Sequence, residues 1–169
     1  MNTSLQRFRQ WNDKPSVGYL TRLVLFELEQ VISIEPVGME VTSSGIMLVA
    51  GAKGVLFEFS QKVCTWQETK VDDEVGELYT ENIEMQVYGQ NKALLSWLYA
   101  NQARRFIGFW RDTNGECFMA GNKDNGLRYQ YRRAITDRSM IQVSIAGKFT
   151  QPSYFLDSSF INTVQFQQF

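Results

Sequence analysis

The stretch RRFIGFWRDTNGECFMAGNKDNGLRYQYRR, residues 104–133, gives the clearest indication of the fold. Short runs rich in aromatic and apolar residues are separated by two Asn-Gly pairs, Asn114-Gly115 and Asn125-Gly126. Both residues of such a pair accept positive φ, which suits the tight turns between antiparallel strands. The stretch therefore predicts three strands joined by two hairpin turns.

A helix is predicted just before these strands, over about residues 91–104. Its leucines recur with helical spacing and would form one apolar face. Asn91 is a suitable N-terminal cap, and Arg104 and Arg105 suit the negative end of the helix dipole. The first two arginines of the quoted stretch thus have a purely structural interpretation.

Most of the remaining sequence predicts strands. Residues 19–34 are rich in β-branched and apolar residues and predict one or two strands. The apolar runs 46–49 and 55–59 are separated by glycines and predict a hairpin. Residues 83–88 alternate apolar and polar side chains, which is typical of a half-buried strand. The preceding segment 71–82, VDDEVGELYTEN, predicts an acidic loop.

The two ends of the chain differ from this pattern. Residues 1–18 show no period and predict an N-terminal arm that carries two isolated aromatic residues, Phe8 and Trp11. The segment 161–169, INTVQFQQF, predicts a polar tail that is loose or docked on a partner. Residues 19–169 are therefore expected to form a single, mainly β domain: an antiparallel β-sandwich or barrel flanked by one helix.

The composition argues against an enzyme. The 169 residues contain no histidine, which is the commonest general base and zinc ligand. Cys64 and Cys117 are expected to be free thiols, and neither has a histidine to activate it. No phosphate-binding loop or nucleophile elbow is present. We therefore expect no catalytic residue, cofactor, metal or small-molecule substrate. No apolar run approaches the ~20 residues of a membrane span.

Charge is distributed unevenly along the chain, although the net charge is −1. Residues 1–90 contain 7 basic and 13 acidic side chains, whereas residues 91–150 contain 10 basic and 4 acidic ones. Two oppositely charged parts could attract copies of the chain to one another. Alternatively, folding mixes these charges over one surface.

A nucleic-acid-binding module is one interpretation of residues 128–133, RYQYRR. Arg128 and Arg132 would hold phosphates while Tyr129 and Tyr131 stack on bases. On a strand, however, these tyrosines and arginines lie on opposite faces, which is also the pattern of an ordinary amphipathic strand. The sequence pI of about 5.5 argues against a dedicated nucleic-acid binder.

Four short motifs follow the predicted helix: D-x-N-G at 112–115, F-x-A-G at 118–121, N-G-L-R at 125–128 and P-x-Y-F at 152–155. In this order, residues 91–156 resemble structural tail proteins of phages and prophages, especially those of Bacteroidetes. The resemblance implies a non-enzymatic subunit of the tail tube, or of a related tail component, that stacks as rings, commonly hexameric. It also implies synthesis in the cytoplasm of a bacterial host and a final place in the virion tail.

The same resemblance implies three kinds of partner: further copies of the chain, other tail proteins and DNA in transit. We expect subunit contacts at the arm, at an acidic set and at a basic set, namely at Phe8, Trp11, Asp72, Asp73, Glu74, Arg128, Arg132 and Arg133. The opposite charges of the last two sets could fix a head-to-tail polarity of assembly. Acidic residues that face a channel would also repel passing DNA.

Overall fold

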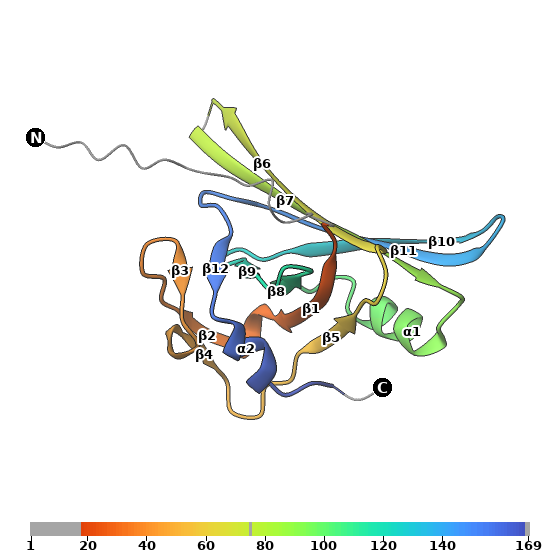
Figure 1. Cartoon of the computed structure of the whole chain (residues 1–169), viewed down its shortest axis with the longest axis horizontal. Coiled ribbons are helices and arrows are strands. Elements are labelled where there is room, and N and C mark those ends of the chain that lie inside the picture. The colour runs from red at the N-terminus through yellow and green to blue at the C-terminus, as the bar shows by residue number, and fades with distance from the viewer. Residues whose placement is uncertain (1–17, 75, 168–169) are drawn as a thin grey trace, which may run out of the picture.

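Two β-sheets pack face to face in a computed structural model that describes residues 18–74 and 76–167 (Figure 1). The larger sheet has six strands in the order β3 (Glu40–Val41), β12 (Tyr154–Leu156), β9 (Cys117–Ala120), β8 (Phe106–Asp112), β1 (Leu20–Glu27) and β5 (Val55–Glu58). The smaller sheet has four, in the order β10 (Arg128–Ile135), β11 (Ser139–Phe149), β7 (Gly76–Tyr88) and β6 (Cys64–Asp73). The other described elements are β2 (Val31–Ile34), β4 (Ile46–Leu48), α1 (Lys92–Ala100), α2 (Ser158–Thr163) and two 3-10 helices, Leu28–Gln30 and Ser43–Gly45. The predicted mainly β fold with a flanking helix is confirmed.

The six-stranded sheet is buried on both faces because it lies between two hydrophobic cores. Leu23 of β1 and Trp110 of β8 belong to the core shared with the four-stranded sheet and α1. Their neighbours in sequence, Val24 and Phe109, belong to the second core, which α2, β2 and β4 cover. A strand buried on both faces is apolar at every position, which explains the continuous run FIGFW in β8.

The four-stranded sheet, by contrast, has one covered face. Ile83 and Met85 of β7 and Ile141 and Val143 of β11 are buried in the first core, and polar residues lie between them along each strand. The predicted half-buried strand 83–88 is thereby confirmed as part of β7. Figure 1 shows the β6–β7 hairpin extending beyond the sandwich at one end of this sheet, and the β10–β11 hairpin extending at the other.

One of the two predicted Asn-Gly hairpins is confirmed and the other is wrong. Asn114-Gly115 joins β8 and β9, which pair with each other, and Gly115 has φ of 86°. At Asn125-Gly126 the chain instead crosses from β9 in one sheet to β10 in the other. Gly126 serves close packing there, because an added Cβ would lie 2.8 Å from the carbonyl oxygen of Phe106.

The predicted hairpin of runs 46–49 and 55–59 is also wrong. β4 pairs with β2, and β5 pairs with β1, so the two runs are not paired with each other. Gly54 lies between them and is packed against β1, where an added Cβ would lie 2.8 Å from the Phe26 ring. The glycines therefore allow the chain to pass closely over β1 rather than to reverse on itself.

The predicted acidic loop 71–82 is a β-hairpin. β6 continues to Asp73, which is the register partner of Gly76 at the start of β7. Lys70 and Glu77 form an ion pair across the hairpin, with 2.8 Å between Nζ and Oε1. Charged residues are depleted in strands, so composition argued for a loop, but exposed side chains on a hairpin need no hydrophobic partner.

The helix prediction is right about the start and wrong about the end. Asn91 caps α1, since its Oδ1 accepts a hydrogen bond from the backbone N of Leu94 at 3.1 Å. The helix ends at Ala100, and Asn101 closes it by donating from backbone and side chain to the Trp97 carbonyl. Arg104 therefore lies beyond the helix and forms an ion pair with Glu27 instead of completing the helix dipole.

The C-terminal segment is not loose over its described part. Asp157 caps the short helix α2, which places Phe160 and Ile161 in the second core. Beyond the helix, the backbone N of Gly54 donates to the carbonyl of Gln165 at 2.9 Å. This part of the tail therefore packs on its own domain, because its apolar residues complete a core that the sequence did not reveal.

Candidate assembly interface

The four-stranded sheet has two open edges, formed by β6 and β10. Within residues 18–74 and 76–167, no strand pairs with the outer side of either. An open edge presents unpaired backbone N–H and C=O groups and is a template for pairing with another strand. The two sets of charged residues predicted from the sequence lie at these edges, one set at each.

The β6 edge is acidic. Asp72 and Asp73 are exposed at the end of this strand, and Glu74 is exposed in the turn that follows. The backbone N of Glu74 donates to the Asp73 carboxylate at 2.7 Å, which helps to form the turn. The three predicted acidic residues are therefore adjacent at the tip of the β6–β7 hairpin.

The β10 edge is basic. Arg128, Arg132 and Arg133 are all exposed, and none forms an ion pair with a described residue. Neutral amides hold two of them in place: Nε of Arg132 donates to Gln142 at 3.0 Å, and Nε of Arg133 donates to Gln90 at 2.9 Å. The arginines are thus positioned while their charge stays uncompensated within the described part of the chain.

The structure brings each set together and keeps the two sets apart. Two strands, β11 and β7, separate β10 from β6 in the sheet. The alternative that folding mixes the opposite charges does not hold for these two edges. The two other predicted contact residues, Phe8 and Trp11, lie outside the described residues.

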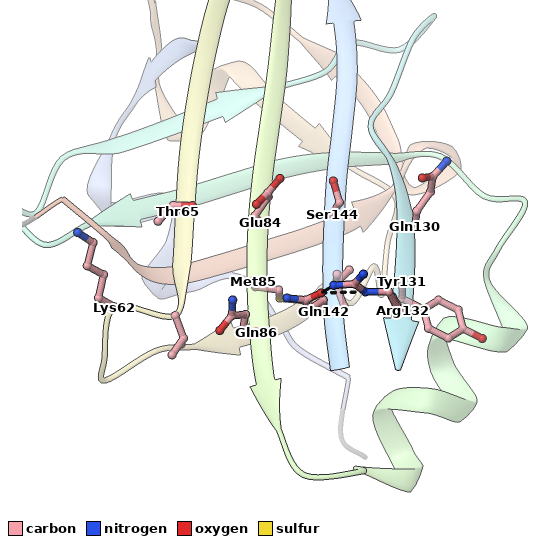
Figure 2. Close-up of a pocket in the computed structure, with 12 residues that line it drawn as sticks. Lys62, Thr65, Glu84, Met85, Gln86, Gln130, Tyr131, Arg132, Gln142 and Ser144 are labelled. Atoms are coloured by element: carbon pink, nitrogen blue, oxygen red, sulfur yellow. Dashed lines mark hydrogen bonds between the residues drawn. The ribbon is translucent and has the colours of Figure 1, made fainter. Parts of the chain in front are cut away.

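Between the edges lies a polar, shallow hollow of about 520 Å³ on the outer face of the sheet (Figure 2). Figure 2 shows polar side chains from all four strands and the turn before β6 on this face, among them Gln130, Gln142, Ser144, Glu84, Gln86, Thr65 and Lys62. Most of the residues that line this hollow are polar, and the others are Val63, Met85, Tyr131 and Val143. The hollow is suited to face water in an assembly.

The inner face of β10 carries the two tyrosines of the nucleic-acid interpretation. Tyr129 is 7% exposed and stacks on Trp97, with 5.6 Å between the ring centroids. Its hydroxyl donates to the carbonyl of Leu98 at 2.6 Å. Tyr131 is half-buried against the same core. Tyr129 is therefore a core residue that joins β10 to α1, and its ring is not available to stack on a base.

Tyr129→Phe should lower the free energy of unfolding by about 0.5–1.5 kcal/mol, because it removes one hydrogen bond and leaves the Leu98 carbonyl without that donor. Urea unfolding followed by circular dichroism measures the change. Tyr99→Phe is the matched control, since Tyr99 lies next to Leu98 on α1 and is 75% exposed. Equal stability of the Tyr129→Phe and Tyr99→Phe variants would contradict the role given to this hydroxyl.

No catalytic arrangement emerges around the cysteines. Cys64 and Cys117 are both buried and free. Burial raises the pKa of the Cys64 thiol to about 12, and burial also raises the pKa of Cys117. Among residues 18–74 and 76–167, no group of three or more acidic or cysteine side chains is arranged to hold a metal ion. No described helix has the length and apolar character needed to cross a membrane.

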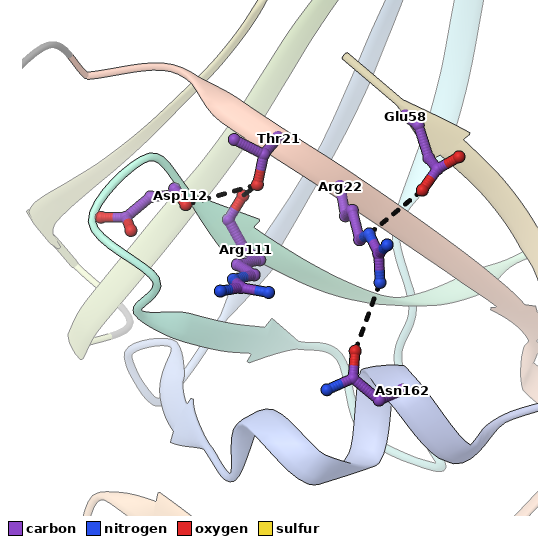
Figure 3. Close-up of polar contacts among 6 residues, drawn as sticks. All are labelled: Thr21, Arg22, Glu58, Arg111, Asp112 and Asn162. Atoms are coloured by element: carbon purple, nitrogen blue, oxygen red, sulfur yellow. Dashed lines mark hydrogen bonds and ion pairs between the residues drawn. The ribbon is translucent and has the colours of Figure 1, made fainter. Parts of the chain in front are cut away.

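Sequence reasoning missed the polar contacts that join neighbouring strands of the six-stranded sheet and attach α2 to it. Figure 3 shows Arg22 of β1 between Glu58 of β5, at 3.1 Å, and Asn162 of α2, at 3.2 Å. It also shows Thr21, whose hydroxyl reaches the carbonyls of Arg111 and Asp112 on β8. These residues join elements far apart in sequence, so no local pattern reveals them.

One missed residue lies inside the molecule. Glu81 of β7 is 0% exposed, although the sequence places it in an acidic segment that reads as solvated. One sequence pattern could have indicated this position. Every second residue of β6 lies on the same side, so Glu68 faces inward together with Cys64 and Trp66. Pairing β6 with β7 places Glu81 directly opposite Glu68.

No protein-family model, curated protein or solved structure matches this chain.

Proposed function

We propose that this chain is a non-enzymatic structural subunit that joins copies of itself edge to edge, through β6 of one copy and β10 of the next. The observation that carries the proposal is a four-stranded sheet with two open edges of opposite charge. The resemblance of residues 91–156 to phage and prophage tail proteins points to a ring or tube of a tail as the setting.

Strand directions favour this pairing. Each strand of the order β10-β11-β7-β6 is antiparallel to its neighbour. Because the number of strands is even, placing β10 of a second copy beside β6 continues the antiparallel alternation without a break. Antiparallel ladders are the more stable kind, and they need no crossover connection.

Charge favours the same pairing, with neighbouring copies staggered along the strands because Arg128 lies level with Gln67 of β6 and not with Asp73, and charge opposes the two symmetric pairings. β10 carries three arginines and no acidic residue, whereas β6 carries Glu68, Asp72, Asp73 and one lysine. Pairing β10 with β10, or β6 with β6, would place like charges next to each other, which costs several kcal/mol at an interface. The contact between copies is therefore head-to-tail, and such contacts close into rings or continue as filaments.

In a closed ring, the position of the six-stranded sheet and the two cores determines which face of the four-stranded sheet points inward. The six-stranded sheet and both cores lie against one face of the four-stranded sheet. Since this bulk needs the larger radius, the polar outer face would line the channel. Amides and hydroxyls on that face suit a water-filled passage for DNA, and Glu84 contributes an acidic group at its centre.

The burial of Tyr129 argues against nucleic-acid binding through Tyr129 and Tyr131. Base stacking requires an exposed ring, and Tyr129 is a core residue whose hydroxyl bonds to α1.

Size-exclusion chromatography with light scattering, followed by negative-stain microscopy of the concentrated chain, tests the proposal. We expect a mass several times that of the 19.5 kDa chain, images of rings or tubes, and a smaller mass as salt screens the charged edges. A monomer at every concentration and at low salt would overturn the proposal.

A further inference from the structure

A buried carboxyl at the base of the β6–β7 hairpin has no part in the proposed interface. Glu81 has two donors: Nε1 of Trp66 donates to Oε2 at 2.6 Å, and the hydroxyl of Ser153 donates to Oε1 at 2.7 Å. Glu68 lies directly opposite in the strand register. Two acidic side chains that face each other in a buried site repel when both are ionised.

Glu68 binds the same segment as Glu81. Its Oε2 accepts a hydrogen bond from the backbone N of Ser153 at 2.6 Å, and its register partner on β7 is Glu81. Two facing carboxyls can share a hydrogen bond only when one of them holds a proton. Ser153 is 8% exposed and lies where the chain crosses from β11 in the small sheet to β12 in the large one. The carboxyl pair therefore fastens this crossover to the hairpin.

The environment of the Glu68–Glu81 pair favours its protonated form. Burial first, and then the hydrogen bond with Glu68, raise the pKa of Glu81 to about 7, although the bonds from Trp66 and Ser153 oppose the rise. The charge of Glu68 acts in the same direction as burial.

No described cation offsets this effect at the pair. On the other side of β7, the register partner of Glu81 on β11 is Gly147, which has no side chain. On β6, Lys70 lies on the same face as Glu68 but forms its ion pair with Glu77. From β12, the neighbouring titratable group is Tyr154, and burial raises the pKa of its hydroxyl, which keeps it neutral.

We propose that Glu68 and Glu81 form a proton-operated latch between the β6–β7 hairpin and the crossover at Ser153. The latch is closed when the pair holds one proton. It opens when that proton is lost to solvent, because two facing carboxylates repel and release the Ser153 segment. This inference concerns the single chain and does not depend on self-assembly.

The direction of the pH effect follows from the number of protons that each state binds. In the unfolded chain Glu81 titrates near its ordinary value of 4.5, whereas in the folded chain it keeps its proton up to about pH 7. The folded state therefore binds more protons between these values, and stability falls as pH rises through that range. A difference of one proton changes the unfolding equilibrium constant by up to about tenfold per pH unit.

Urea unfolding of the full chain from pH 5 to pH 8.5 tests the latch. We expect the urea midpoint of the wild type to fall as pH rises toward 7, and that of Glu81→Gln to stay level. Glutamine is neutral at every pH and can donate to Glu68 while accepting from Trp66, so it mimics the closed latch. Glu84→Gln is the matched control, because Glu84 lies on the outer face of the same strand, and it should behave as wild type.

If Glu81→Gln does not fold, direct titration of the Glu81 carboxyl in the wild type tests the proposal instead. Carboxyl ¹³C NMR of the wild type should show one buried glutamate that titrates near pH 7. In Glu68→Gln the same resonance should titrate at lower pH, because an amide donor replaces the acidic neighbour. Titration of Glu81 near 4.5, or parallel urea curves for wild type and Glu81→Gln, would overturn the proposal.

Discussion

The double variant Arg128→Glu, Arg132→Glu should no longer assemble. Both side chains are exposed on β10, the edge that we pair with acidic β6 of the next copy. Reversal places like charges along that contact and costs about 3 kcal/mol or more, which weakens association by over ~100-fold. Light scattering at a fixed protein concentration measures the loss, and Asp72→Lys, Asp73→Lys should give the same result.

The quadruple variant that combines both reversals should regain assembly. In a head-to-tail contact each chain contributes both edges, so the swap restores complementarity at every junction. Lys53→Glu, Lys123→Glu is the matched control, because it makes the same change of net charge at exposed sites away from β10. If this control also disassembles, net charge rather than edge pairing governs association. If the quadruple variant, whose net charge equals that of the wild type, does not recover, these two edges do not pair with each other.

Trp110→Ala should lower the free energy of unfolding by about 3–5 kcal/mol, as expected for truncation of a large core residue. Trp110 is 0% exposed and packs against Trp66 across the two sheets, with 5.2 Å between the ring centroids. The cavity would therefore lie where the two layers meet. Urea unfolding measures the change, and Ile135→Ala, at a site that is 79% exposed, should stay within about 0.5 kcal/mol of wild type.

Trp110→Phe separates the contribution of ring packing to stability from that of the indole N–H. Nε1 of Trp110 makes no hydrogen bond with a described residue, and a buried donor without a partner costs about 1–3 kcal/mol. Phenylalanine removes that donor and keeps much of the ring, so we expect a far smaller loss than for alanine. A loss under 1 kcal/mol for Trp110→Ala would contradict the placement of this side chain at the centre of the sandwich.

Local patterns predicted the strands better than their partners. The alternation in residues 83–88 identified a half-buried strand because it reports burial directly. The two Asn-Gly pairs look alike in sequence, yet only Asn114-Gly115 joins neighbouring strands. What distinguishes them is whether the chain stays in one sheet, and this depends on packing between segments far apart in sequence.

The candidate interface was partly accessible from the sequence. Uneven charge identified the acidic residues near Asp73 and the basic residues near Arg132. Their location at opposite edges of one sheet was not accessible, because it follows from the strand order β10-β11-β7-β6. The burial of Glu81 also depends on this strand order, so the sequence alone predicted a solvated loop at 71–82.

The two proposals concern different parts of the β6–β7 hairpin. The edge contact uses its exposed tip around Asp72 and Asp73, whereas the latch uses its buried base at Glu81. Charge reversal at the tip should therefore leave the pH dependence of single-chain unfolding unchanged. Conversely, Glu81→Gln should leave assembly at pH 6 unchanged, because it mimics the protonated form.

Chemical cross-linking between the two edges tests the central claim most directly. Thr69→Cys on β6 and Gln130→Cys on β10 introduce exposed thiols, while Cys64 and Cys117 are buried. With a short bismaleimide, the double variant should give a ladder of covalent dimers, trimers and higher multiples, and a mixture of the two single variants should give dimers alone. A double variant that stays monomeric, or that links no better than a Thr69→Cys, Tyr99→Cys control, would contradict edge-to-edge assembly.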